Sequence, residues 1–186
     1  MCIRDRTNTS SLTGFDVNTG YTLGSDPNNG VNGGAIPDQY INWAFTRYPG
    51  VFDVVCYTGT GSATTQAHSL GVVPELIIVK SRNSALNWVT YNVTLGNSNY
   101  VMLNSSVASG AAGAALWNST TPTSSVFSLG TGASNASAVT YVAYLFATKA
   151  GISKVGSYTG NGSSQTINCG FTTGIRWVMI KRTDST

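Results

Sequence analysis

The stretch Pro74-Glu75-Leu76-Ile77-Ile78-Val79-Lys80 decides the fold class of this chain. Its apolar residues follow one another without the alternation of a strand that is exposed on one face. The pattern therefore predicts a central strand that is covered on both faces. Proline at its start is compatible with a strand, because the first residue need not donate a hydrogen bond there.

Six further segments, on either side of this strand, are typical of short strands bounded by Gly, Asn and Ser. They cover residues 51–57, 63–69, 87–92, 100–103, 125–129 and 140–146. Residues 105–115 are small and are expected to form a loop. Seven short strands in about 100 residues predict an all-β fold, namely an antiparallel β-sandwich of jelly-roll-like type.

The composition of the chain excludes several classes of protein. Ser, Thr and Asn account for 62 of the 186 residues, and only 9% of the chain is charged. An ordinary soluble domain is about one quarter charged, and a mainly helical one is rich in Glu, Lys, Ala and Leu. The 41% of hydrophobic residues argues against disorder. The net charge of +3 is scattered along the chain, which argues against a nucleic-acid partner. No apolar run approaches the ~20 residues that span a bilayer, so we expect no membrane insertion.

An internal repeat organises the chain. The motif Tyr57-Thr58-Gly59-Thr60-Gly61-Ser62 recurs 101 residues later as Tyr158-Thr159-Gly160-Asn161-Gly162-Ser163. Residues 40–85 align with residues 141–186 without a gap, and 12 of these positions are identical. Residues 20–24 also correspond to residues 126–130, with a small change of offset.

The repeat predicts where the units begin and end. We expect residues 7–50 to be the C-terminal part of a preceding repeat, residues 51–150 to be a complete β-sandwich repeat, and residues 151–186 to be the N-terminal part of a following repeat. Residues 39–47 are expected to form a strand, because the residues aligned with them are β-branched and aromatic. The two incomplete parts have unpaired edges, so one hypothesis is that Tyr40–Thr46 and Val155–Thr159 pair with each other.

The first six residues, Met1–Arg6, are treated separately. They resemble the translation of a sequencing adapter, and we expect them to be an artefact of environmental sequencing. Without them the chain has 8 basic and 6 acidic residues and retains two cysteines, Cys56 and Cys169. A disulfide between these cysteines is one interpretation, and free structural thiols are the favoured one.

No group of residues points to catalysis, to a metal site or to a cofactor. The chain has one histidine, His68, which aligns with Cys169 and has no second ligand beside it, so a structural role is favoured. A polysaccharide hydrolase would need a pair of carboxylates. The acidic candidates Asp53 and Glu75 both align with basic residues in the other copy. We therefore expect no enzymatic activity, no metal and no cofactor.

Exposed aromatic residues are the candidates for ligand contact, because aromatic faces stack on sugar rings. Trp43 and Trp177 align with aromatic or apolar residues, which predicts places in the core. Trp117 lies in a region rich in loop-forming residues and is expected to be exposed. Trp88 and Tyr91 alternate along a predicted strand. The candidate ligand-binding residues are Trp117, Asn118, Trp88 and Tyr91.

Four motifs resemble a domain of unknown function that occurs in tandem in large marine bacteriophage and prophage proteins. They are Tyr-Thr-Gly-x-Gly-Ser at residues 57–62, Leu-Gly-Val-Val-Pro-Glu-Leu-Ile-Ile-Val-Lys-Ser-Arg at 70–82, Thr-Tyr-Val-Ala-Tyr-Leu-Phe-Ala at 140–147 and Val-Met-Ile-Lys-Arg-Thr-Asp-Ser at 178–185. The resemblance implies a virion-associated protein, often of the tail or tail fibre, located outside cells. It brings no catalytic residues.

Three functional hypotheses follow. The first is a structural or adhesion module of a phage virion, with other virion proteins or host cell-surface glycans as partners. Residues 108–123 would supply the glycan contact, and a homo-oligomer belongs to this hypothesis. The second is a repeat of a bacterial surface adhesin. The third and least favoured is a polysaccharide hydrolase, which would depend on Asp53 or Glu75.

Overall fold

The computed structural model describes residues 12–17, 20–24, 32, 40, 42 and 44–184. The chain divides into two compact units, Met1–Phe45 and Thr46–Thr186. In the first unit, β1 (Leu12–Val17) and β2 (Gly20–Leu23) pair in antiparallel fashion. β2 covers the segment that aligns with residues 126–129 of the complete repeat, and a strand is present there too.

The second unit contains eight strands and one short helix within its described residues. They are β3 (Phe52–Thr58), β4 (Thr64–Ala67), β5 (Leu76–Ser81), β6 (Val89–Asn92), β7 (Asn99–Met102), β8 (Gly110–Ala111), α1 (Ala114–Trp117), β9 (Val126–Leu129) and β10 (Thr140–Phe146). All seven strands that the sequence predicts between residues 51 and 146 are present, and the predicted bounds of β10 are the observed ones.

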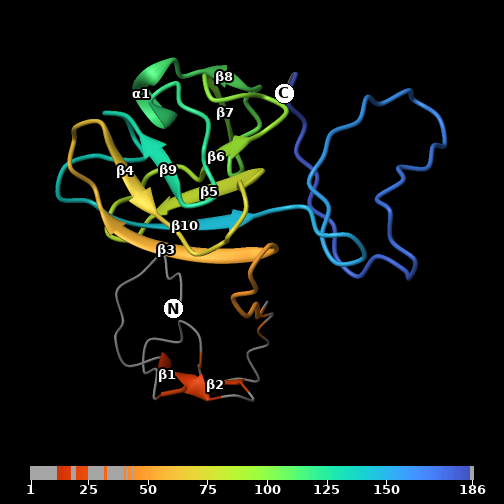
Figure 1. Cartoon of the computed structure of the whole chain (residues 1–186), viewed down its shortest axis with the longest axis horizontal. Coiled ribbons are helices and arrows are strands. Elements are labelled where there is room, and N and C mark those ends of the chain that lie inside the picture. Colours follow the sequence, from red (N-terminus) through yellow and green to blue (C-terminus); the bar gives the residue numbers. More distant parts are fainter. Residues whose placement is uncertain are drawn as a thin grey trace. The chain divides into compact units, whose positions relative to one another are not determined.

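The strands form two sheets. One has six antiparallel strands in the order β3-β10-β5-β6-β7-β8, and the other pairs β4 with β9. Figure 1 shows β4 and β9 lying over one face of the larger sheet. The unit is therefore almost entirely β, with two layers in a sandwich-like arrangement, as the sequence predicts.

β5 occupies the central position that its sequence predicts. It pairs with β10 on one side and with β6 on the other. Ile77 and Val79, on one face, are 0% and 1% exposed, and Ile78, on the opposite face, is 7% exposed. A run of consecutive apolar residues is stable as a strand only where both faces are covered in this way.

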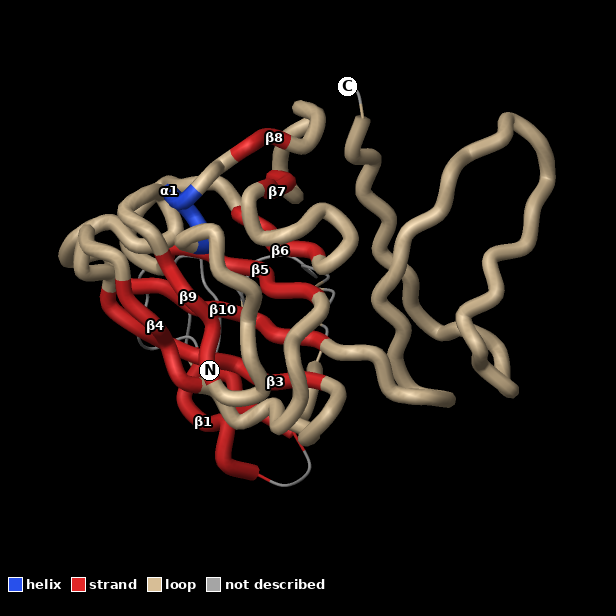
Figure 2. Tube along the Cα trace, turned by 45° about the horizontal axis from the view of Figure 1, so that its top comes forward, coloured by secondary structure: helices blue, strands red, loops and turns tan. Residues whose placement is uncertain are grey.

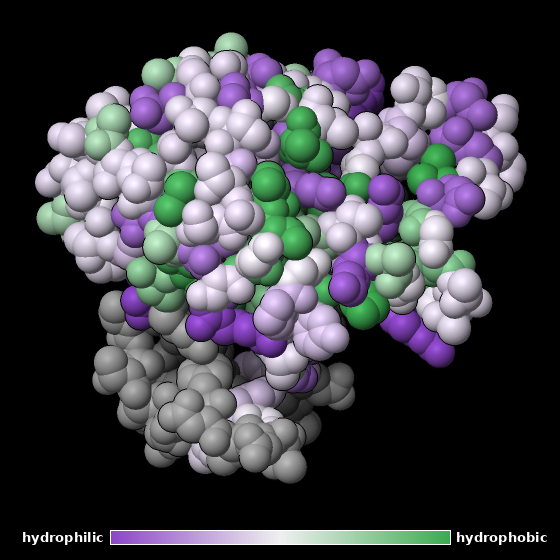
Figure 3. Space-filling view, viewed as in Figure 1, coloured by the Kyte–Doolittle hydropathy of each residue, from purple (hydrophilic) through white to green (hydrophobic). Residues whose placement is uncertain are grey.

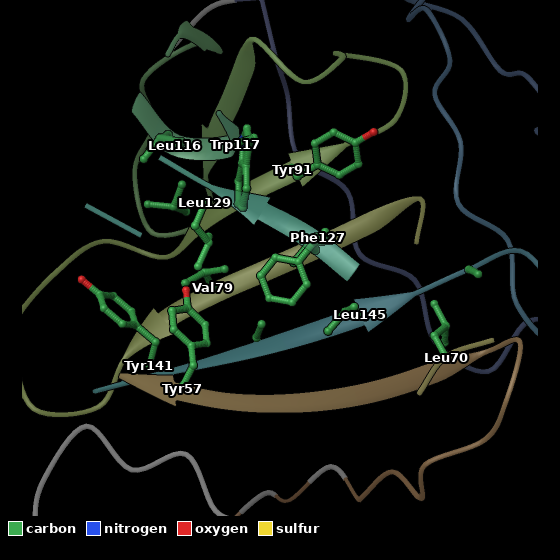
Figure 4. Close-up of a cluster of buried hydrophobic side chains, with 14 residues drawn as sticks. Tyr57, Leu70, Val79, Tyr91, Leu116, Trp117, Phe127, Leu129, Tyr141 and Leu145 are labelled. Atoms are coloured by element: carbon green, nitrogen blue, oxygen red, sulfur yellow. The ribbon is translucent and has the colours of Figure 1, made fainter. Parts of the chain in front are cut away.

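The core lies between the two layers (Figure 4). From the larger sheet, Tyr57 and Tyr141 stack with ring centroids 5.1 Å apart. From β9, Phe127 and Leu129 are buried against this face. Each such side chain contributes roughly 1.5–3 kcal/mol through removal of its apolar surface from water. Although β9 has only four residues, Phe127 and Leu129 cover the core face of the larger sheet.

The backbone repeats itself at the offset that the sequence shows. Tyr48 and Phe52 form a bridged turn around Gly50, whose φ is +77°. Lys149 and Ser153 form the same turn around Gly151, whose φ is +75°. Both turns carry the same backbone hydrogen bonds, at 2.9–3.0 Å. Glycine recurs at their centres because residues with a side chain rarely adopt a positive φ.

Two expectations for the flanking segments, a strand at residues 39–47 and its pairing with residues 155–159, are wrong. Described residues 154–184 contain no strand, as the continuous loop colouring in Figure 2 shows. Of the segment 39–47, the residues that the structure describes (40, 42 and 44–47) lie outside strands as well. The proposed pairing of the two segments is therefore absent from the described residues. A strand needs neighbours for its backbone hydrogen bonds, as β10 has in β3 and β5.

Candidate functional site

The repeated motif Tyr57–Ser62 is fixed against the loop before β10. The hydroxyl of Tyr57 donates to the carbonyl oxygen of Ser134 at 2.6 Å. The amide of Gly59 donates to Val139 O at 2.8 Å. A Cβ atom on Gly59 would lie 2.2 Å from the carbonyl oxygen of Ala136. In the complete repeat the turn therefore packs backbone against backbone at Gly59, where only glycine fits.

Asn135 is completely buried and links the turn at residues 59–62 to the loop that precedes β10. Its Nδ2 donates to the carbonyl oxygens of Ser62 and Gly130, both at 2.7 Å, and its Oδ1 accepts from the amide of Thr60 at 2.9 Å. With these partners, the polar atoms of this buried side-chain amide are hydrogen-bonded, as buried polar groups require. The sequence analysis missed Asn135, because one polar residue in a loop carries no periodic signal of burial.

His68 is a structural residue in this arrangement. Its Nδ1 accepts from the amide of Leu70 at 3.3 Å, which leaves Nε2 as the donor to Thr123 O at 3.1 Å. Both ring nitrogens thus have backbone partners in the neutral tautomer. Among the described residues, no three His, Cys, Asp or Glu side chains gather into a group that could hold a metal ion.

Asp53 is 1% exposed and ties the entry of the repeat to the loop that follows β4. Its carboxylate accepts from the amides of Ser69 at 2.6 Å and Val54 at 2.8 Å and pairs with the guanidinium of Arg47. Burial by itself would raise its pKa. The hydrogen bonds from Arg47, Ser69 and Val54 outweigh burial and hold the pKa of Asp53 below its ordinary value of 3.8.

Glu75 likewise accepts hydrogen bonds from a distant segment, in this case from the residues that follow β10. Its Oε2 accepts from the amide of Thr148 at 3.1 Å and from the Thr148 hydroxyl at 2.5 Å. The hydroxyl oxygen of Thr148 in turn accepts from the amide of Val155 at 3.1 Å. Both candidate carboxylates are thus engaged by the protein, and the lowered pKa of Asp53 is the opposite of what a general acid needs.

Two of the four candidate ligand-binding residues belong to the core. Trp117 was expected to be exposed but is 2% exposed, and Tyr91 is 1% exposed. Their rings meet edge to face with centroids 5.8 Å apart, and Trp117 Nε1 donates to Asn99 O at 3.1 Å. The expectation is wrong because the end of the predicted loop runs into a short helix, α1, whose residues Leu116 and Trp117 are buried.

The other two candidates remain accessible. Asn118 is exposed and ends α1 in the left-handed conformation, with φ of +50°. Trp88 is half-buried, and its amide donates to Asn104 Oδ1 at 2.9 Å. Trp177, expected in the core, is 53% exposed, and Trp43 lies outside the described residues. The structure thus leaves Asn118 and Trp88 as the accessible members of the predicted site.

Two further features bear on chemistry and location. No disulfide joins Cys56 to Cys169. In the part of the chain that the structure describes, no helix combines the length and apolar character needed to cross a membrane.

Comparisons with known proteins place the chain in a family. No curated protein and no solved structure matches it. The model of a domain of unknown function, DUF7483, matches residues 48–186, which is about three quarters of the chain and includes both copies of the Tyr-Thr-Gly-x-Gly-Ser motif. The chain therefore belongs to the DUF7483 family of domains of unknown function.

Proposed function

We propose that this chain is a structural repeat module of a phage virion protein, of the tail or tail-fibre type. One observation carries the structural part of the proposal: the polar side chains that are candidates for chemistry form hydrogen bonds that hold turns together. Asn135 joins two turns, His68 bonds to two backbone groups, and Asp53 joins the entry of the repeat to a distant loop. Side chains engaged in this way stabilise a fold and are not available for reaction with a substrate.

The surface supports work outside cells. The visible face in Figure 3 is mostly pale, with scattered strongly hydrophilic and strongly hydrophobic residues, as expected where Ser, Thr and Gly are abundant. Electrostatic screening lengths fall from about 8 Å at 0.15 M salt to about 3 Å at 1 M. A fold that depends on hydrogen bonds and burial more than on surface ion pairs keeps its stability over that range.

Microscopy on particles tests the virion setting. Antibody fragments raised against the complete repeat are applied to purified particles of the phage that encodes the chain. Labelling of the tail or its fibres is expected. Labelling of the bacterial surface with none on the particles would favour the adhesin alternative, and absence of label from both would contradict either role.

A glycan array decides whether the module also binds host glycans. Asn118 and Trp88 are the remaining accessible candidates, so the full chain is compared with Trp88→Ala and Asn118→Ala. Binding that either variant abolishes would make the module adhesive. A purely structural module gives no signal above background for all three proteins. Other virion proteins, or further copies of the chain, would then be its partners.

A further inference from the structure

Residues 153–182 align with residues 52–81, which form β3, β4 and β5 in the complete repeat, but they form no strand. Val178 and Ile180 are 66% and 65% exposed, whereas their equivalents Ile77 and Val79 are 0% and 1% exposed. Tyr158 is 49% exposed, against 8% for its equivalent Tyr57. This segment therefore presents to solvent the residues that the complete repeat buries, which is a large cost in apolar exposure.

The segment nevertheless begins a repeat in the same local conformation. Besides the shared turn at Lys149–Ser153, Gly162 has a φ of +71°, close to the +72° of Gly61. The amide of Ser163 bonds to the side chain of Asn161 at 2.9 Å, as the amide of Ser62 bonds to that of Thr60 at 3.2 Å. The turns are in place, but the described residues contain no material that pairs with residues 153–159 and 177–182 as strands.

The complete repeat shows what that material is. β10 lies between β3 and β5 and pairs with β3 over its whole length and with β5 from Tyr141 to Phe146. Its residues Tyr141, Ala143 and Leu145 contribute to the same core face as Ile77 and Val79. β9 then covers this face with Phe127 and Leu129. Both β9 and β10 come from the second half of the repeat, residues 86–150.

We propose that residues 153–182 form a strand acceptor whose occupant is the second half of a repeat. A strand of the β10 sequence inserts between residues 153–159 and residues 177–182 and pairs antiparallel with each. Backbone hydrogen bonds supply the affinity, and the alternation of tyrosine, alanine and leucine on one face supplies the specificity. The inference goes beyond the structural role and does not depend on the virion setting.

The experiment completes the repeat in register. Because Thr186 aligns with Ala85, the full chain is extended after Thr186 by a second copy of residues 86–150. Hydrogen exchange of amides 177–182 is then measured in the extended and the unextended chain. The expected result is at least a 100-fold slowing of exchange in the extended chain, towards the rates of residues 76–81, which serve as the folded internal reference.

Two further measurements keep the inference testable if the added half fails to fold. In the first, the unextended chain is mixed with a synthetic peptide of residues 138–148, which should slow exchange at 177–182. In the second, Val178→Asp in the extended chain should abolish the protection, whereas Thr172→Asp, at an exposed position, should leave it unchanged. Unprotected amides both in the extended chain and with the peptide would overturn the proposal. Protection that grows with the concentration of the unextended chain alone would assign the strand to a second copy of the chain and also overturn it.

Discussion

Gly59 shows how one residue type is fixed by its neighbours and not by flexibility. Its amide bonds to Val139 O, and a Cβ atom would meet Ala136 O at 2.2 Å. Substitution Gly59→Ala must therefore push two turns apart, and we expect a loss of about 3 kcal/mol in the free energy of unfolding. Urea denaturation of the full chain measures it.

The repeat supplies a matched control for this substitution. Gly160 is the equivalent glycine, and a Cβ atom there meets nothing within 4 Å. We expect Gly160→Ala to change the free energy of unfolding by no more than about 0.5 kcal/mol, as is usual at exposed positions. Equal losses for the two variants would show that the motif is intolerant of alanine for a local conformational reason.

Asp53 gives the stability of the repeat a dependence on acid pH. Hydrogen bonds from Arg47 and backbone amides hold its pKa below 3.8 in the folded protein against the opposing effect of burial. The unfolded state therefore takes up the proton first as the pH falls. The contribution of Asp53 is fully present above the ordinary pKa and is lost as the pH falls through the lower, folded pKa. Urea denaturation between pH 2 and 7 measures the loss.

A second aspartate–arginine pair separates this effect from general acid denaturation. The side chain of Asp184, which pairs with Arg182, is 78% exposed, whereas that of Asp53 is 2% exposed. We expect Asp184→Asn to leave the pH profile unchanged, since exposed ion pairs contribute little. Asp53→Asn should lower stability at neutral pH and flatten the acid limb. An unaltered acid limb in Asp53→Asn would rule out this carboxylate as its source.

At the scale of elements, two turns behave as one unit because Asn135 joins them. Substitution Asn135→Ala leaves the amide of Thr60 and the carbonyls of Ser62 and Gly130 without this partner. Thr60 and Ser62 are exposed, but Gly130 is buried, and a buried backbone group left unpaired costs about 1–3 kcal/mol, so we expect a loss of about 2 kcal/mol. Hydrogen exchange should show the turn at 59–62 and the loop at 130–138 opening together. Separate opening of the two would contradict the coupling.

The sequence predicted the strands of the complete repeat because each has a clear local pattern. β5 is a continuous apolar run and β10 is a β-branched and aromatic run, and both have the neighbours that such patterns require. The sequence did not predict α1, because this helix has no capping side chain. Its four residues are also too few to show a helical hydrophobic periodicity. The same sequence pattern also predicted strands at residues 155–159, where no partner strand is present to complete the hydrogen bonds.

The candidate site was predictable only in part, for a similar reason. The structural interpretation of His68 agrees with its two backbone hydrogen bonds. Trp117 was misplaced because exposure depends on which way a single turn of helix faces. Asn135 was missed because its burial results from contact with a turn more than 70 residues away. Contacts of that range lie outside any local pattern.

At the scale of the whole repeat, the first strand begins next to the place where the last strand ends. Phe52 begins β3 beside Phe146, which ends β10, and their rings lie 4.9 Å apart. The amide of Ala147 donates to Val51 O at 3.0 Å. In a tandem array each complete repeat is therefore attached through two adjacent strand ends. Tension along the chain pulls these ends apart instead of passing through the body of the sandwich.

This attachment predicts how the repeat responds to force. Hydrogen bonds between antiparallel strands lie perpendicular to the strands, so tension at the two adjacent ends loads them one pair at a time. We expect the full chain, held by its termini, to release the complete repeat at low force. The gain in length should be roughly 330 Å, as about 100 residues become extended. Handles attached instead at Ser62 and Thr148 load β3 and β10 from opposite ends, so that their bonds must break together. A markedly higher unfolding force is expected in that second geometry, and equal forces in the two geometries would refute sequential opening from the joined ends.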